Sequence, residues 1–256
     1  MLILSIYFLW FITYSILGWV YESIICSIQE RSLVNRGFLN GPLCPVYGFG
    51  GLSIIFVLDQ RTDNVIILFF IGMLLTCLVE YITAVLLEKL FHAQWWDYSS
   101  NHFNFQGRIC LLGAVVFGTL SILLIKYIHP FVSNLMSRLP NSVVIASSIF
   151  IFFAVMFDLY ITVRHLLRLN GSLEEIQSAF NRFVEQYLKR ADGLKNALLD
   201  RFEESEFYNE RIKKLIRLDR FQNIRLARAF PKLKSLRYND AWQKLKSILL
   251  NTNKNS

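Results

Sequence analysis

The sequence predicts an all-α fold: a polytopic helical membrane protein with about five transmembrane helices and a cytoplasmic helical tail. Hydrophobic residues make up 54% of the 256 residues, and the mean hydropathy is +0.39; a soluble domain of this length is normally less apolar. Residues 1–163 carry a net charge of −1, whereas residues 164–256 carry +9. Composition and charge therefore separate a membrane domain, residues 1–165, from a basic tail, residues 166–256.

Five apolar stretches are each near the roughly 20 residues that a helix needs to cross the hydrocarbon core. The second stretch is short because Gly and Pro interrupt its start, and polar loops are expected between the stretches, the last of them over residues 129–141. The expected spans are residues 2–27, 43–58, 65–90, 109–128 and 143–163.

An odd number of spans places the two ends of the chain on opposite sides of the membrane. Residues 164–256 hold 20 of the 27 Lys and Arg residues, beginning with Arg164 and Arg168 directly after the last span. Basic residues flanking a span favour the cytoplasm. We therefore expect the N-terminus outside and the C-terminus in the cytoplasm.

The tail is predicted to be helical and amphipathic. Asn170-Gly171 is expected to break the chain, and Ser172 to Glu175 reads as a capping box that opens a new helix towards Arg190. A second break is expected at Asp192-Gly193. Two further helices are then predicted, over residues 194–229 and 233–250, separated by Pro231. A solvated helical bundle and contact with anionic lipid both fit this pattern.

The stretch from Asn35 to Gly50, NRGFLNGPLCPVYGFG, suits neither a regular helix nor a regular strand. Irregular backbone beside membrane spans is tolerated only where protein buries it or where it lines a cavity. This stretch is therefore a candidate for the functional site of the molecule. Its key residues are Gly37, Gly41, Pro42, Cys44, Pro45, Tyr47 and Gly48, with Gly107 at the corresponding place later in the chain.

A shift of 66 residues superimposes the first pair of spans on the second. Glu22 then matches Glu88, and Cys44 matches Cys110. A duplicated pair of hairpins plus one further helix would explain this match. Gly- and Pro-interrupted segments at matching places of such repeats point to a binding site in transporters.

Several acidic residues lie in or at the ends of the spans, where an ionisable side chain is costly and reads as functional. Arg36 and Arg108 are the expected partners of Glu22 and Glu88. A pathway for a polar or cationic substrate, a proton relay and a structural ion-pair network all remain open. The predicted pathway or buried polar network comprises Glu22, Asn35, Arg36, Glu80, Glu88, Asp97, Asn104 and Arg108.

The remaining observations concern aromatic residues and motifs that the sequence lacks. Trp19, Trp95, Trp96 and Tyr98 read as interface aromatics, although the last three also suit a docking surface. No metal site and no cofactor are expected, because the Cys and His spacings match no metal motif. The absence of a phosphate-binding loop and of nucleophile motifs predicts that the chain is not an enzyme, with no catalytic residues.

Together the motifs are similar to those of the type IV ABC-transporter permease family, also called CmpB-like. The resemblance covers about residues 1–165. It implies a multi-pass protein of the bacterial cell membrane with a permease role. The motifs are Tyr14-Ser-x-Leu-Gly-Trp19 with Glu22, Asn35-Arg-Gly-Phe-Leu-x-Gly-Pro-x-Cys-Pro-x-Tyr-Gly48, Glu80-Tyr81, Trp95-Trp-Asp-Tyr-Ser99, and Phe103-Asn104 with Gly107-Arg-Ile-Cys110.

Two functions follow from these observations. The first is a transport component whose polar site lies between the two interrupted hairpins. The second is a membrane-anchored scaffold or sensor whose basic tail binds lipid or proteins. The expected partners are the lipid bilayer, a separate ATPase subunit or another cytoplasmic protein, and further copies of the chain; nucleic acid is not expected.

Overall fold

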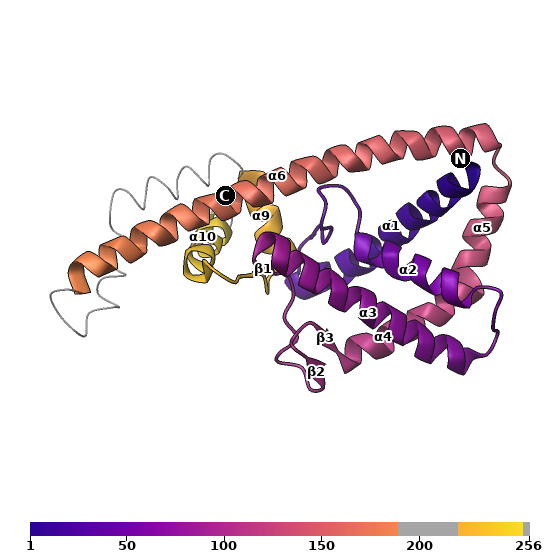
Figure 1. The fold of residues 1–256 in the computed structure, drawn as a ribbon, viewed down its shortest axis with the longest axis horizontal. Coiled ribbons are helices and arrows are strands. Elements are labelled where there is room, and N and C mark those ends of the chain that lie inside the picture. Colours follow the sequence, from indigo (N-terminus) through magenta and orange to yellow (C-terminus); the bar gives the residue numbers. More distant parts are fainter. Residues whose placement is uncertain (189–219, 253–256) are drawn as a thin grey trace. The chain divides into compact units, whose positions relative to one another are not determined.

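The computed structural model describes residues 1–188 and 220–252, and it confirms the helical class (Figure 1). Four helical stretches are long and apolar enough to cross a membrane, with a fifth, shorter apolar helix between the first two. The membrane part consists of α1 (Leu2–Glu30), α2 (Pro45–Leu58), α3 (Val65–Phe91), α4 (Leu111–Leu123), the π-helical turn η1 (Leu124–Ile128), α5 (His129–Ser137) and the start of α6 (Asn141–Leu188).

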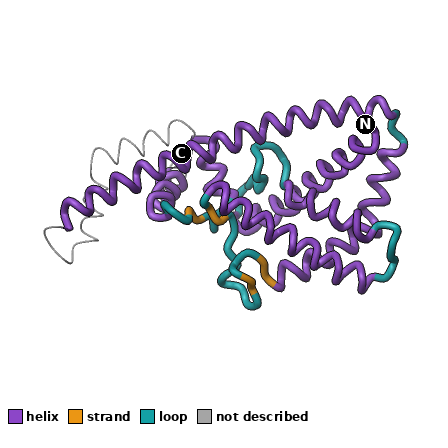
Figure 2. Tube along the Cα trace, viewed as in Figure 1, coloured by secondary structure: helices purple, strands orange, loops and turns teal. Residues whose placement is uncertain are grey.

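The remaining elements are short. Figure 2 shows that the strands are small segments within loops rather than a sheet layer. They pair in antiparallel fashion, β1 with β4 and β2 with β3. Their bounds are β1 (Ala93–Gln94), β2 (Asn104–Phe105), β3 (Ile109–Cys110) and β4 (Lys234–Ser235), and the tail adds α9 (Arg220–Ala229) and α10 (Asn239–Thr252).

The contacts divide the chain into two units. The first unit contains residues 1–87 and 96–162, and the second contains residues 88–95 and the described part of 163–256. Two of the three boundaries therefore fall inside α3 and α6, and the third follows β1. The end of α3 and the segment after it, which the sequence assigned to the membrane domain, pack with the tail residues instead.

In the first unit, α1 and α2 form an antiparallel hairpin whose irregular link, residues 31–44, precedes α2. α2 has 14 residues, about 21 Å at 1.5 Å per residue, which is shorter than the roughly 30 Å hydrocarbon core. α3 and α4 repeat the order helix, irregular link, helix, as a duplication predicts. Cys44 and Cys110 each occupy the N-cap of the helix that follows.

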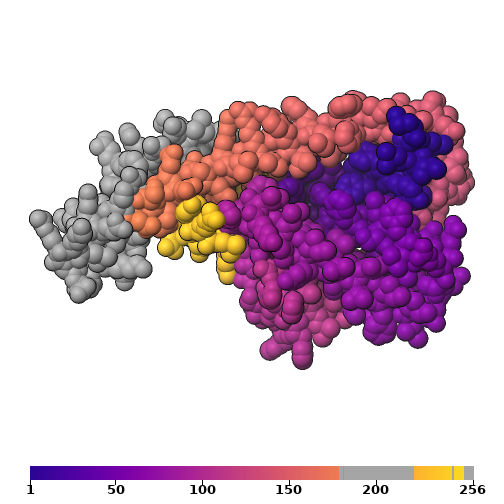
Figure 3. Space-filling view, viewed as in Figure 1, coloured from indigo at the N-terminus to yellow at the C-terminus, as the bar shows by residue number. Residues whose placement is uncertain are grey.

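The outward face of α3 is apolar along its length. Leu74, Leu78, Ile82 and Leu86 recur at every fourth position and are all more than half exposed. α3 contributes to the face of the first unit seen in Figure 3. An exposed stripe of this kind is what contact with lipid tails requires.

The predicted end of the fourth span was wrong. Residues 129–141 were expected to form a loop, but α4, η1 and α5 form one helical stretch up to Ser137. Pro130 falls in the first turn of α5, where its missing N–H group and fixed φ angle are tolerated. The π-helical turn before it absorbs the change in backbone geometry.

The predicted helix break at Asn170-Gly171 was also wrong, because α6 continues through both residues. Leu169, Leu173 and Ile176 are buried at helical spacing on either side of the glycine. Burial of this stripe outweighs the roughly 1 kcal/mol that an interior Gly costs a helix. Ser172 consequently lies inside α6 and does not cap a new helix.

The second unit has its own core around Trp242, which is 1% exposed and donates from Nε1 to the carbonyl of Leu233 at 2.9 Å. The Trp95 ring packs edge-on against Phe230, with centroids 4.8 Å apart. The last helix starts at Asn239 rather than at the predicted residue 233, because Lys234 and Ser235 pair with β1. The predicted break at 192–193 and most of the helix predicted over 194–229 lie outside the described residues.

Candidate functional site

The irregular link 31–44 runs back along α1 instead of looping away from it. One α1 residue per helical turn contacts the link, from Ser27 back to Ser15. These contacts extend over 12 residues of α1, or about 18 Å of helix. The contacts are Ser27 Oγ with the Val34 N–H (3.0 Å), Ser23 Oγ with the Arg36 N–H (3.2 Å), Trp19 Nε1 with Asn35 Oδ1 (2.7 Å) and the Ser15 carbonyl with the Cys44 N–H (3.0 Å).

The other side of the link is fastened to α6. Asp158 accepts the backbone N–H of Asn40 at 3.2 Å and that of Gly41 at 2.8 Å. It also accepts the Asn40 side-chain amide at 2.9 Å, and the same amide donates to Thr162 Oγ1 at 3.1 Å. Pro42 beside them is exposed. The link is therefore held between two helices, and several of its backbone N–H groups donate to protein acceptors, as irregular backbone beside membrane spans requires.

Close packing between α1 and α2 depends on missing side chains. An added Cβ at Gly18 would lie 2.1 Å from Cγ of Tyr47, and one at Gly48 would lie 2.3 Å from Oγ of Ser15. Within the link, a Cβ at Gly37 would lie 2.9 Å from the Gly41 carbonyl oxygen. Pro45 is the first residue of α2, where proline suits a helix.

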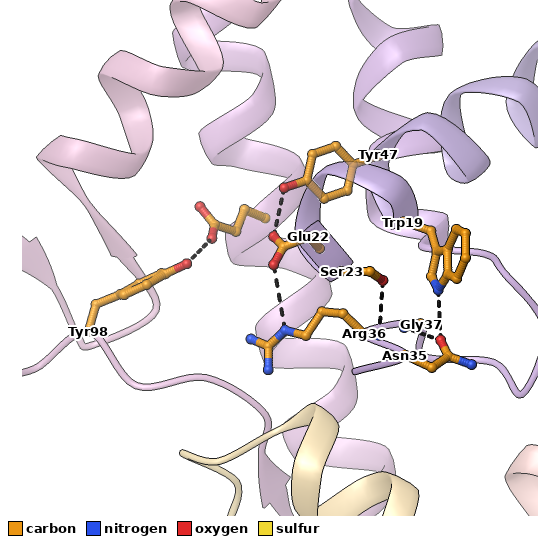
Figure 4. Close-up of polar contacts among 9 residues, drawn as sticks. Trp19, Glu22, Ser23, Asn35, Arg36, Gly37, Tyr47 and Tyr98 are labelled. Carbon is orange, nitrogen blue, oxygen red and sulfur yellow. Dashed lines mark hydrogen bonds and ion pairs between the residues drawn. The ribbon is translucent and has the colours of Figure 1, made fainter. Parts of the chain in front are cut away.

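Glu22 is the centre of a charged network that Figure 4 shows. Arg36 Nε lies 3.5 Å from one carboxylate oxygen, and the Tyr47 hydroxyl donates to the other at 2.7 Å. Three elements contribute: α1, the irregular link and α2. The negative charge of Glu22 is thus matched by a guanidinium and a hydroxyl.

Glu80 of α3 is 7% exposed and accepts a hydrogen bond from the Tyr98 hydroxyl at 3.3 Å. Burial, with the charges of Glu80 and Glu22, raises the pKa of Tyr98 well above its usual value. The hydroxyl therefore remains protonated and available as a donor. Within residues 1–188 and 220–252, no ion pair to Glu80 is found.

The second irregular link closes on itself around Tyr98. Its backbone N–H donates to the carbonyl of Gly107 at 2.8 Å, and Gly107 has a φ of 67°, which suits glycine. Trp96 Nε1 donates to the Arg108 carbonyl at 2.9 Å. Asn104 Oδ1 accepts the Gly107 N–H at 3.0 Å. These contacts fix the backbone that presents Tyr98 to Glu80.

Four other predicted residues have contacts that do not involve Glu22 or Glu80. Asp97 accepts the N–H of Ser99 at 2.9 Å in a local turn. The Arg108 guanidinium lies over the Tyr81 ring, 5.5 Å from its centroid, and also contacts Gln106. Glu88 and Trp95 belong to the second unit, where Trp95 is 4% exposed.

A cavity of about 280 Å³ lies within the first unit, bordered by α1, α2, α3, α4 and η1. Its walls are aromatic and aliphatic, and Glu80 is the carboxylate among them. The volume equals that of roughly nine waters at about 30 Å³ each. The principal lining residues are Tyr14, Gly18, Tyr21, Tyr47, Gly50, Thr76, Glu80, Phe117, Ser121 and Ile128.

A second polar group adjoins the cavity at Tyr14. The Tyr14 hydroxyl and His129 Nδ1 are 2.7 Å apart, and His129 Nε2 lies 3.8 Å from Asp59. Tyr14 and His129 are 3% and 5% exposed. The sequence did not predict that Tyr14, His129 and Asp59 would meet, because they come from three separate segments.

Other site residues were also missed. Ser15, Ser23 and Ser27 share a four-residue spacing with Trp19, and that stripe was the available signal for a chain packed along α1. Asp158 was noted only as an acid near the end of a span. No group of three His, Cys, Asp or Glu within 1–188 and 220–252 could hold a metal.

The long apolar helices define an integral membrane protein, and the carboxylate of Glu80 is buried within it. The family model "Putative ABC-transporter type IV" matches residues 9–163, more than half of the chain. The chain belongs to this family. No curated protein and no solved structure matches it.

Proposed function

We propose that the protein is a transport component and that its substrate pathway passes through the cavity between α1, α2, α3 and α4. The observation that carries this proposal is a buried carboxylate, Glu80, lining a cavity in a protein of a transporter family. Acidic side chains at membrane depth are costly and are retained mainly along substrate or ion pathways. The Glu22–Arg36–Tyr47 network would border this pathway.

The remaining features of the proposal concern orientation and partners. The protein would lie in a bacterial cell membrane with its N-terminus outside and its C-terminus in the cytoplasm, because the basic tail follows the last span. The chain would not itself be an enzyme. A separate ATPase subunit would supply energy and would dock on the cytoplasmic links or on the second unit.

Cysteine accessibility tests the pathway directly. Thr76→Cys would place a thiol at the cavity, whereas Leu74→Cys would place one on the outward apolar face of the same helix, where the native side chain is 68% exposed. Both variants would carry Cys77→Ser to remove the neighbouring thiol. Each would be reconstituted in liposomes and treated with a membrane-impermeant charged methanethiosulfonate from either side, with mass spectrometry as the readout.

A pathway must exchange with water, so the Thr76→Cys variant is expected to react. The Leu74→Cys variant is expected to stay unmodified, because charged reagents do not enter lipid. Equal inertness of both variants would mean that the cavity is sealed and structural, and the transport proposal would fail.

One observation favours the scaffold or sensor function as a second candidate. The described tail residues form a packed core around Trp242, together with Leu226, Leu245 and Leu249, each at most 1% exposed. A folded tail unit can present a defined surface to a protein partner. Retrieval of one stoichiometric partner by the intact chain, but not by a Trp242→Ala variant, with no reaction at Thr76→Cys, would favour this function.

A further inference from the structure

The charges around the cavity do not balance. Glu22 and Glu80 interact electrostatically, and Arg36 is the cation that pairs with Glu22. Glu80 has the Tyr98 hydroxyl as its hydrogen-bond donor, and no ion pair to it occurs within the described part of the chain. One hydrogen bond does not offset the several kcal/mol that burial of an ionised carboxylate costs. Ionised Glu80 therefore requires a cation from outside the protein.

The cavity walls restrict what that cation can be. Among the residues that the structure describes, no Lys, Arg or His side chain lines the space, whereas the rings of Tyr14, Tyr21, Tyr47 and Phe117 do. The Phe117 and Tyr47 rings meet edge-on with centroids 5.8 Å apart. Aromatic faces attract cations, most strongly where water is excluded. Aliphatic neighbours such as Leu17 and Leu120 offer nothing to a hydrated inorganic ion.

We propose that this cavity binds a small organic monocation with an apolar body, of the quaternary ammonium class, with Glu80 as the counter-ion and the aromatic rings around the cationic centre. This inference deepens the proposed function and rests on the cavity being the substrate pathway. The volume of about 280 Å³ is close to the lower limit of roughly 300 Å³ for small-molecule sites, so the bound ion must be small.

The test uses the full-length chain in lipid nanodiscs, titrated with benzyltrimethylammonium chloride in a calorimeter, with empty nanodiscs as the blank. Sodium benzenesulfonate is the matched anion, since it carries the same ring with the opposite charge. Glu80→Gln removes the charge with little change of shape. Glu30→Gln makes the same change at the exposed end of α1.

Saturable binding of the ammonium ion is expected, weakened by at least about tenfold in Glu80→Gln and unchanged in Glu30→Gln. Phe117→Leu keeps the carboxylate and removes one ring, so a loss of about two- to fivefold is expected. That variant keeps the test decisive if Glu80→Gln fails to fold. Absent saturable binding, equal binding of benzenesulfonate, or indifference to both substitutions would overturn the inference.

The two proposals fail separately. Reaction at Thr76→Cys without ammonium binding would leave the pathway in place and remove only its ligand class, a result expected if Glu80 carries a proton instead. Ammonium binding that depends on Glu80, with an inert Thr76→Cys, would keep the ligand class and remove the transport pathway.

Discussion

Replacing Gly18 with Ala tests the contact that brings α1 and α2 together. The new Cβ would lie 2.1 Å from Cγ and 2.4 Å from Cβ of Tyr47. Because the clash includes the Cβ of Tyr47, rotation of that side chain cannot relieve it, and α2 must move by about 1 Å to restore ordinary contact. Overpacking of this kind costs about 1–3 kcal/mol.

The same movement acts on the charged network. The Tyr47 hydroxyl donates to Glu22 at 2.7 Å, and a displacement of about 1 Å takes the pair beyond hydrogen-bond range. A hydrogen bond to a charged group contributes about 1.5–3 kcal/mol. Gly18→Ala is therefore expected to lower the free energy of unfolding by about 2.5–6 kcal/mol, measured by tryptophan fluorescence during denaturation in detergent.

Two comparisons separate the contributions. Gly50→Ala is the matched control in α2, since its Cβ would meet Thr76 at an ordinary 3.6 Å and should be neutral or stabilising. In a Tyr47→Phe background the clash remains but the hydrogen bond is already absent, so Gly18→Ala should cost only about 1–3 kcal/mol. If Gly18→Ala and Gly50→Ala have equal stability, the reasoning from close approach is refuted.

Three other outcomes are expected. Gly171→Ala should stabilise the second unit by about 0.5–1 kcal/mol, because nothing lies within 4 Å of the added Cβ; a loss in thermal unfolding experiments would contradict the continuous α6. Trp242→Ala should destabilise that unit by about 3–5 kcal/mol, seen as faster limited proteolysis after residue 163 with cleavage before residue 87 unchanged. Asp158→Asn removes the charged acceptor of two link N–H groups and should speed alkylation of buried Cys44; an unchanged rate would show that α6 does not hold the link.

Much of the fold could be predicted because its signals are local. Apolar runs of span length predicted α1, α3 and the start of α6, and Gly with Pro predicted an irregular link before α2. These features follow from hydropathy and backbone sterics, which depend on neighbouring residues. The break expected at Gly171 does not occur. Local propensity favours a break there, but burial of Leu169 and Leu173 in the tertiary structure outweighs it.

The candidate site was less accessible to prediction. Glu80 and Glu22 were recognisable as costly acids, and the expected pairing of Arg36 with Glu22 is confirmed. Their hydroxyl donors, Tyr98 and Tyr47, were not predicted, because these residues reach the two acids from separate segments. The role of Asp158 could not be predicted, because it depends on α6 packing beside the link, which lies more than a hundred residues earlier in the sequence.

The sequence alone determined that this chain is a helical membrane protein with a basic tail and that its backbone is interrupted around residues 35–50, because transfer free energies and φ restrictions act residue by residue. Only the tertiary structure decided that the interrupted segment is held along α1, that Tyr47 joins the Glu22–Arg36 pair while Glu80 lines a cavity, and that residues 88–95 pack with the tail. Those outcomes depend on distances between side chains far apart in the chain, which packing sets and local sequence does not.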